Sequence, residues 1–166
     1  MGRLVEEVRE WNSPVVGAYL LWRFTQAYSQ QHRFGDAPVV VLHFIAHTLL
    51  TCVDYCDEIS HRKDLASFAR AFTENKKSDK LACFGQIVSK QRGTTMQAID
   101  IAVATGLLVW DTDSAKLVAR DFKLTRGSPS KGTAVQSLDG NAKKIGKWFA
   151  ELNDVSTIVL QLGVVL

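Results

Sequence analysis

The stretch that decides the fold is PVVGAYLLWRF, residues 14–24, in which Arg23 is the only charged side chain. Pro14 suits the first turn of a helix, because the N–H that proline lacks has no partner there. At about 100° per residue, the apolar side chains form two stripes on different sides of a helix that runs to about residue 31. One stripe holds Val15, Ala18, Tyr19 and Trp22, and the other holds Leu20, Phe24, Ala27 and Tyr28. Such a helix must be covered on two sides.

Two segments of the chain are candidates for these covers. The first is PVVVLHFIAHTLL, residues 38–50. It opens the run VVVLHFIAHTLLTCVDYCDEI, which predicts a mostly apolar helix from 39 to about 58 that pairs with the opening helix as a helical hairpin. The second is a late amphipathic helix with Ile145, Trp148, Phe149 and Leu152 on one face. If that late helix does not cover the second stripe, a partner protein does.

The composition is that of one ordinary globular domain. The chain has 166 residues, of which 46% are hydrophobic and 22% charged, enough to close one core without disulfide staples. Apolar runs stop near ten residues and the first fifteen residues lack the apolar core of a signal peptide, so we expect no membrane span and a cytoplasmic protein. Three cysteines cannot all pair within the chain, and we expect free thiols.

The predicted order of elements is helices, then a hairpin, then helices. Short helices at about 65–72, 78–88 and 94–105 precede Gly106, after which LLVW and KLVARDF read as strands around the turn DTDS. Helices followed by a hairpin is the order of a winged helix. The sequence therefore predicts a mainly α fold, a helical bundle with a winged-helix-like element, in a single domain at 1–166. Its parts are a helical core at 14–105, a hairpin at 106–123 and C-terminal helices at 134–166.

No catalytic or metal constellation stands out. His43, His47, Cys52 and Cys56 are zinc-ligand types, but on one continuous helix the histidines and the cysteines lie on opposite sides and cannot share an ion. Two histidines in so apolar a segment are more often hydrogen-bonded core residues, although a metal hydrolase that also uses His61 stays a remote alternative. Asp111 and Asp113 fit a hairpin turn better than a magnesium site. We therefore predict no enzyme, no cofactor and no metal.

Positive charge is concentrated in one segment. Residues 115–147 carry eight Lys and Arg against two Asp, a net +6, whereas 1–114 and 148–166 are each slightly acidic. Contact with DNA phosphates, contact with an acidic protein and a plain solvated surface all fit this segment. The helix before the hairpin, TTMQAIDIAVATG, is poor in residues that read base edges, so sequence-specific recognition is not expected. The candidate contact residues are Arg120, Lys123, Arg126, Lys131, Lys143, Lys144 and Lys147.

The opening NSPVVGAYLLWRFTQAY resembles the N-P-A-x-x-A-x-L-L-W-x-F-x-x-x-Y start of the middle components of bacterial three-component ABC-ATPase systems, the group that contains the Lamassu defence system. Ser13-Pro14 stands where that family often has Pro-Ala. The resemblance continues through ATGLLVWDTDSAKLVA at 104–119 and AKKIGKWFAELNDVSTIVLQLGV at 142–164. The residues that carry it best are Leu21, Trp22, Phe24, Tyr28, Gly106, Leu107, Leu108, Gly146, Trp148, Phe149, Leu162 and Gly163.

The resemblance implies a non-catalytic subunit that bridges an SMC- or Rad50-like ATPase and a nuclease-type effector in defence against phages or plasmids. We predict that the protein binds the ATPase directly and holds the effector inactive until foreign DNA is sensed. Because Trp and Tyr often anchor interfaces, the aromatic residues and the apolar C-terminus are our candidate partner contacts. They are Tyr19, Trp22, Phe24, Tyr28, Trp110, Trp148, Phe149 and Leu166. The alternative function is that of a winged-helix DNA-binding regulatory protein.

Overall fold

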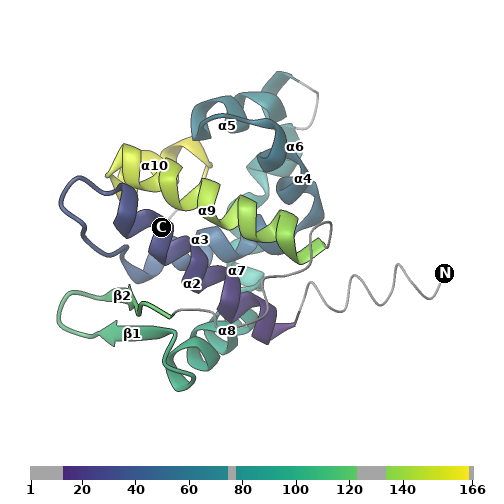
Figure 1. Ribbon diagram of the computed structural model, residues 1–166. Coiled ribbons are helices and arrows are strands. Elements are labelled where there is room, and N and C mark those ends of the chain that lie inside the picture. The colour runs from purple at the N-terminus through teal and green to yellow at the C-terminus, as the bar shows by residue number, and fades with distance from the viewer. Residues whose placement is uncertain (1–12, 75–77, 123–133, 165–166) are drawn as a thin grey trace.

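A computed structural model describes residues 13–74, 78–122 and 134–164. The fold is mainly α, as predicted, and it is built around the long helix α2 (Pro14–Gln31), with the hairpin at one edge (Figure 1). The other helices are α3 (Val40–Thr51), α4 (Val53–His61), α5 (Leu65–Glu74), α6 (Ser78–Ala82), α7 (Phe84–Lys90), α8 (Arg92–Ala104), α9 (Ala134–Leu152) and α10 (Val155–Gln161). The strands are β1 (Leu108–Asp111) and β2 (Lys116–Ala119).

Helix α2 is covered on both sides by the chain itself. Its main neighbours are α9 on one side and α8 on the other, with β2 beside α8 (Figure 1). Phe24 belongs to a core cluster shared with α3, α4, α5 and α9, whereas Trp22 belongs to a smaller cluster shared with α8 and the hairpin. Helix α3 also packs on α2, as expected, with His43 against Thr25 and Phe24, but its contact with α2 is smaller than that of α9 or α8. The late helix, α9, is the second cover, as expected if the chain itself rather than a partner covers the second stripe.

The predicted helix from 39 to 58 breaks at Cys52, and this corrects the sequence analysis. Cys52 has extended backbone angles (φ −91°, ψ 117°), and α3 and α4 meet at an angle of 91°. The bend turns α4 towards α5 and α9, where Tyr55 and Ile59 enter the core. Among the described residues no single helix is long and apolar enough to span a membrane. The bent pair of α3 and α4 meets the length and composition test, with α3 mostly buried inside the fold.

Other helix boundaries differ by smaller amounts. The helix predicted at 78–88 is divided at Cys83 into α6 and α7, and α8 begins at Arg92, before the predicted threonine cap. Helix α8 ends as expected, because Gly106 takes a positive φ of 77° that few other residues tolerate. Helix α10 is capped by Asp154, whose carboxylate accepts hydrogen bonds from the backbone of the next turn.

The predicted hairpin is confirmed. Strands β1 and β2 are antiparallel, with Val109 opposite Val118 and Trp110 opposite Leu117. The Asp111 carboxylate accepts hydrogen bonds from Asp113 N (3.2 Å) and from the Ser114 hydroxyl, which is the turn role expected for it. Inward-facing leucines on both strands pack on α2 and α8. The winged-helix assignment itself stays a prediction.

Candidate interaction surfaces

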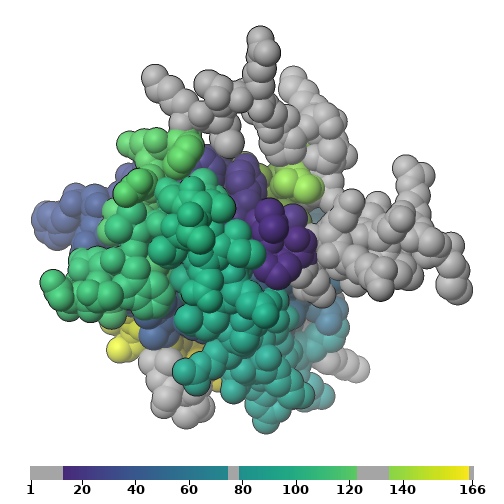
Figure 2. Space-filling model, turned by 90° about the horizontal axis from the view of Figure 1, so that it is seen from below, coloured from purple at the N-terminus to yellow at the C-terminus, as the bar shows by residue number. Residues whose placement is uncertain are grey.

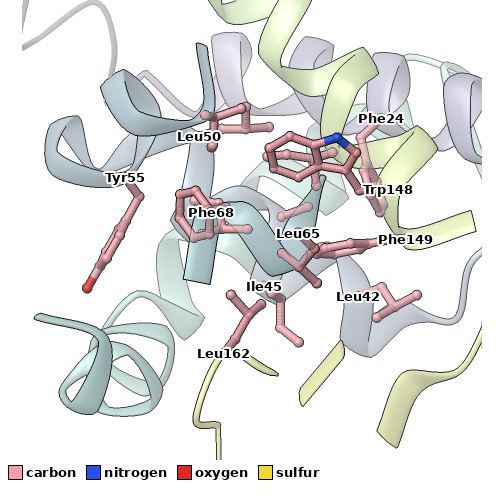
Figure 3. Close-up of a cluster of buried hydrophobic side chains, with 14 of the residues drawn as sticks. Phe24, Leu42, Ile45, Leu50, Tyr55, Leu65, Phe68, Trp148, Phe149 and Leu162 are labelled. Atoms are coloured by element: carbon pink, nitrogen blue, oxygen red, sulfur yellow. The ribbon is translucent and has the colours of Figure 1, made fainter. Parts of the chain in front are cut away.

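Most of the aromatic residues predicted as partner contacts lie in the core instead. Trp22 is 1% exposed, Trp148 is 3% exposed, and Phe24, Tyr28 and Phe149 are also buried. Figure 3 shows Phe24, Trp148 and Phe149 facing one another among the leucines of the larger cluster, and the rings of Phe24 and Phe149 meet edge to face at 5.7 Å. The reason is the two-sided cover of α2. These five side chains cannot reach a partner without unpacking, so their predicted contact role is corrected.

Both buried indoles donate hydrogen bonds that tie distant segments together. Trp22 Nε1 donates to Arg120 O (2.9 Å) at the end of β2, and Trp148 Nε1 donates to Lys63 O (2.6 Å) before α5. Tyr19 and Trp110 are partly exposed and remain candidate partner contacts. Leu166 lies outside the described residues.

His43 and His47 are hydrogen-bonded core residues, as the sequence analysis favoured. His43 Nε2 lies 2.9 Å from Thr25 Oγ1, whose hydroxyl donates to Leu21 O (2.7 Å), and His43 Nδ1 lies 3.3 Å from Val39 O. In the same way, His47 Nδ1 lies 3.0 Å from Thr95 Oγ1. Within the described ranges no three His, Cys, Asp or Glu side chains are placed to share a metal ion.

Acidification is expected to destabilise the fold through these two histidines. Burial lowers the pKa of His43 and of His47 from 6.5 to about 4, so the unfolded chain binds more protons than the folded one. Their stabilising effect is complete above pH 6.5 and falls towards pH 4, by about 1.4 kcal/mol per pH unit for each histidine. The free energy of unfolding, measured with urea at about pH 7.5, 6, 5.5 and 5, reports this decline. A folded His43→Gln variant should show about half the slope, and a flat profile in the wild type would contradict the prediction.

A basic groove, which we define by Lys63, Lys143, Lys144 and Lys147, runs along α9. With Gly140, Trp148 and Glu151 these lysines line a hollow of about 370 Å³. Lys144 Nζ donates to Ile59 O (3.1 Å) and Ser60 O (3.0 Å), the end of α4, where a cation is favoured by the helix dipole. Lys63 and Lys147 are exposed, and no ion pair engages either of them in the described part of the chain.

Lys143, the remaining lysine of the basic groove, belongs to a charged network at its edge. Lys143 Nζ lies 2.8 Å from Asp139 Oδ2, while Arg23 Nε (2.6 Å) and the Tyr19 hydroxyl (2.8 Å) donate to Asp139 Oδ1. Burial raises the pKa of Asp139, but the three hydrogen bonds outweigh burial and the pKa is lowered overall. Asp139 is therefore a carboxylate that joins α9 to α2 and is already neutralised.

The predicted basic residues do not form one surface. Lys143, Lys144 and Lys147 share the basic groove, whereas Arg120 lies at the hairpin, across α2 from α9 (Figure 1). Lys123, Arg126 and Lys131 lie outside the described residues. Sequence reasoning missed Lys63, and no spacing could have found it, since the contact between Lys63 and Trp148 joins positions 85 residues apart.

A second surface, the hairpin surface, is formed by β1, β2 and the last turn of α8. Three neighbouring valines are exposed on it: Val103 is 37% exposed, Val109 is 38% exposed and Val118 is 42% exposed, whereas valines in a core are buried. Beside them, a hollow of about 450 Å³ is lined by α8 residues 103–104, Gly106, β1 residues 108–110 and Arg120. Figure 2 shows α8 and the hairpin together on one face of the molecule.

The fold and its surfaces define a class of protein: a small, mainly helical protein whose aromatic residues lie mostly in the core and which has a basic groove on one face and the hairpin surface on another. The chain belongs to the ABC-three component (ABC-3C) system Middle Component 3 family, whose model matches residues 1–166. The predicted resemblance is thereby confirmed at the level of the middle components. No curated protein and no solved structure matches the chain.

Proposed function

We propose that this protein is a non-catalytic adaptor that joins the ABC ATPase of its three-component system to a separate effector. The observation that carries the proposal is membership, over the whole chain, in a family of middle components. We further propose that the ATPase is SMC- or Rad50-like, that the effector is of nuclease type, and that the system is a Lamassu-type defence against phages or plasmids in the cytoplasm. In this proposal the adaptor restrains the effector until foreign DNA is sensed.

The arrangement of the two surfaces supports a connecting role. The basic groove lies on α9 and the hairpin surface lies across α2, so two partners can bind without competing for one face (Figure 1). Between them, α8, α2 and α9 are joined by the two core clusters. A closely packed core resists deformation, so it holds two bound partners at a defined separation.

Co-expression with the products of the neighbouring genes tests the adaptor role. We expect the ATPase, this protein and the effector to elute together in size-exclusion chromatography, and the ATPase and effector to elute separately when this protein is left out. Effector activity measured with and without this protein tests the restraint. Elution of this protein alone in every combination would overturn the proposal.

The basic groove favours DNA contact as a second candidate function. Lys63 and Lys147 are exposed cations at one hollow, and phosphate contacts of this kind are independent of base sequence. Duplex DNA titrated into the isolated protein at low salt should bind and be released as salt rises, and a Lys63→Gln, Lys147→Gln double variant should bind more weakly. Absence of binding at low salt would exclude this function.

A further inference from the structure

The two outer edges of the hairpin differ in whether their backbone groups are paired. Arg120 N donates to Leu107 O (3.0 Å), so in the antiparallel register Val109 and Val118 form the next hydrogen-bonded pair. On β2, the outward N–H of Leu117 donates to Pro38 O (3.3 Å), and Val39 bridges to Lys116. The outer edge of β2 is therefore occupied by the segment before α3.

The outer edge of β1 is open. By the same alternation, Leu108 and Trp110 turn their backbone N–H and C=O groups away from β2, and no backbone hydrogen bond from the described ranges reaches them. In Figure 1 the last turn of α8 lies beside the start of β1, and no other described element lies beyond that strand on this side. An open strand edge is a row of unpaired donors and acceptors that another extended chain can satisfy.

The surroundings of this edge fit a polypeptide. The hollow beside β1 is lined by the apolar residues Val103 and Val109, and Trp110 also borders it. Arg120 supplies the cation of the hollow, and no acidic side chain pairs with it in the described part of the chain. Backbone groups, apolar walls and one cation together match an extended segment with an apolar and an acidic side chain.

We propose that β1 accepts an extended segment of another subunit of the same complex, which adds to the hairpin as a third strand. The segment's backbone pairs with Leu108 and Trp110, an apolar side chain packs over Val109, and a carboxylate meets Arg120. This proposal rests on the proposed function, since the partner is one of the two subunits that the adaptor joins. It assigns the hairpin surface to a protein partner and leaves the basic groove free.

A second copy of this chain fits the edge less well. Self-pairing through a four-residue strand covers far less than the roughly 1,200 Å² that a stable interface needs. The only acidic side chain of β1, Asp111, already accepts hydrogen bonds from its own turn, so the β1 strand of a second copy brings no free carboxylate to Arg120. A different subunit can supply the acid from its added strand and further contact area from its surface outside that strand.

The test compares Trp110→Pro with Trp110→Ala. Both variants remove the indole, but only proline removes the outward N–H, and proline is tolerated at an open edge because that N–H has no partner within the hairpin. The purified ATPase and effector encoded beside this protein are titrated against the wild type and both variants. We expect one subunit to bind Trp110→Pro at least tenfold more weakly than Trp110→Ala, with circular dichroism confirming that both variants are folded.

Charge reversal at Arg120, which lines the hollow beside β1, provides the second arm. Arg120→Glu should weaken binding of the same subunit at least tenfold relative to Arg120→Lys. Equal affinities within each pair of variants would overturn the strand addition while leaving the adaptor role standing. Wild-type protein that binds neither subunit would overturn both, and a dimer that forms alone and is lost in Trp110→Pro would show that the occupant is a second copy instead.

Discussion

Replacing Trp22 with alanine is expected to lower the free energy of unfolding by about 3 to 5 kcal/mol, the range typical of large aromatic residues removed from a core. Trp22 is 1% exposed and packs between α2, α8 and the hairpin. Its loss leaves a cavity that helices fixed on several sides cannot close, and it removes the donor that serves Arg120 O. Urea unfolding followed by circular dichroism measures the change.

Trp22→Phe is the matched control for this variant. Phenylalanine keeps much of the buried ring but cannot donate to Arg120 O, so the expected loss is smaller and reports the unsatisfied carbonyl, about 1 to 3 kcal/mol. If Trp22→Ala instead unfolds at the wild-type midpoint and fails to join the ATPase and effector, the side chain acts in docking and its assignment to the core is wrong.

Replacing Gly146 with alanine is expected to destabilise the fold although alanine favours helices. A Cβ at this position would lie 2.5 Å from Phe24 O, 2.9 Å from Ala27 Cβ and 3.0 Å from Tyr28 N. Two of these atoms belong to the backbone of α2 and cannot rotate away, so α9 must shift from α2 along their main contact. Overpacking of this kind costs about 1 to 3 kcal/mol, or more where the backbone is fixed.

Gly140→Ala is the control on the same helix. Nothing lies within 4 Å of a Cβ at Gly140, so there alanine should act through helix propensity alone and raise the stability by about 1 kcal/mol. The two substitutions are chemically identical and are expected to have opposite signs. The thermal unfolding midpoints of both variants measure these two effects. A higher midpoint for Gly146→Ala would contradict the close contact between α9 and α2.

Local patterns were read correctly where neighbouring residues decide the conformation. Helix α2 begins at Pro14, α8 ends before Gly106, and the Asp111 turn joins two strands, all as predicted. Each of these features depends on a backbone preference of one or two residues. The break at Cys52 was missed because cysteine has no such backbone preference. The bend is favoured instead by the burial of Tyr55 in α4.

The candidate surfaces were predicted less completely. Most of the aromatic residues predicted as partner contacts lie in the core, because the pattern on one helix cannot tell a core stripe from a docking stripe, since both are apolar. The segment 115–147 was correctly recognised as basic, yet folding places Arg120 across α2 from Lys147 and brings Lys63 to Lys147 instead. The open edge of β1 could not be foreseen at all, because it depends on where residues 38–40 pair.

The sequence by itself determined that this chain is a mainly helical middle component with a hairpin, because periodicity, caps and family motifs are local properties of the chain. Only the tertiary structure decided that α9 and α8 cover α2, that Trp22 and Phe149 face inward, and that β1 keeps a free edge. These outcomes depend on close approach between residues far apart in sequence. The contact between Gly146 and the backbone of Phe24 is the clearest case, since steric fit between two helices leaves no periodic signal in either one.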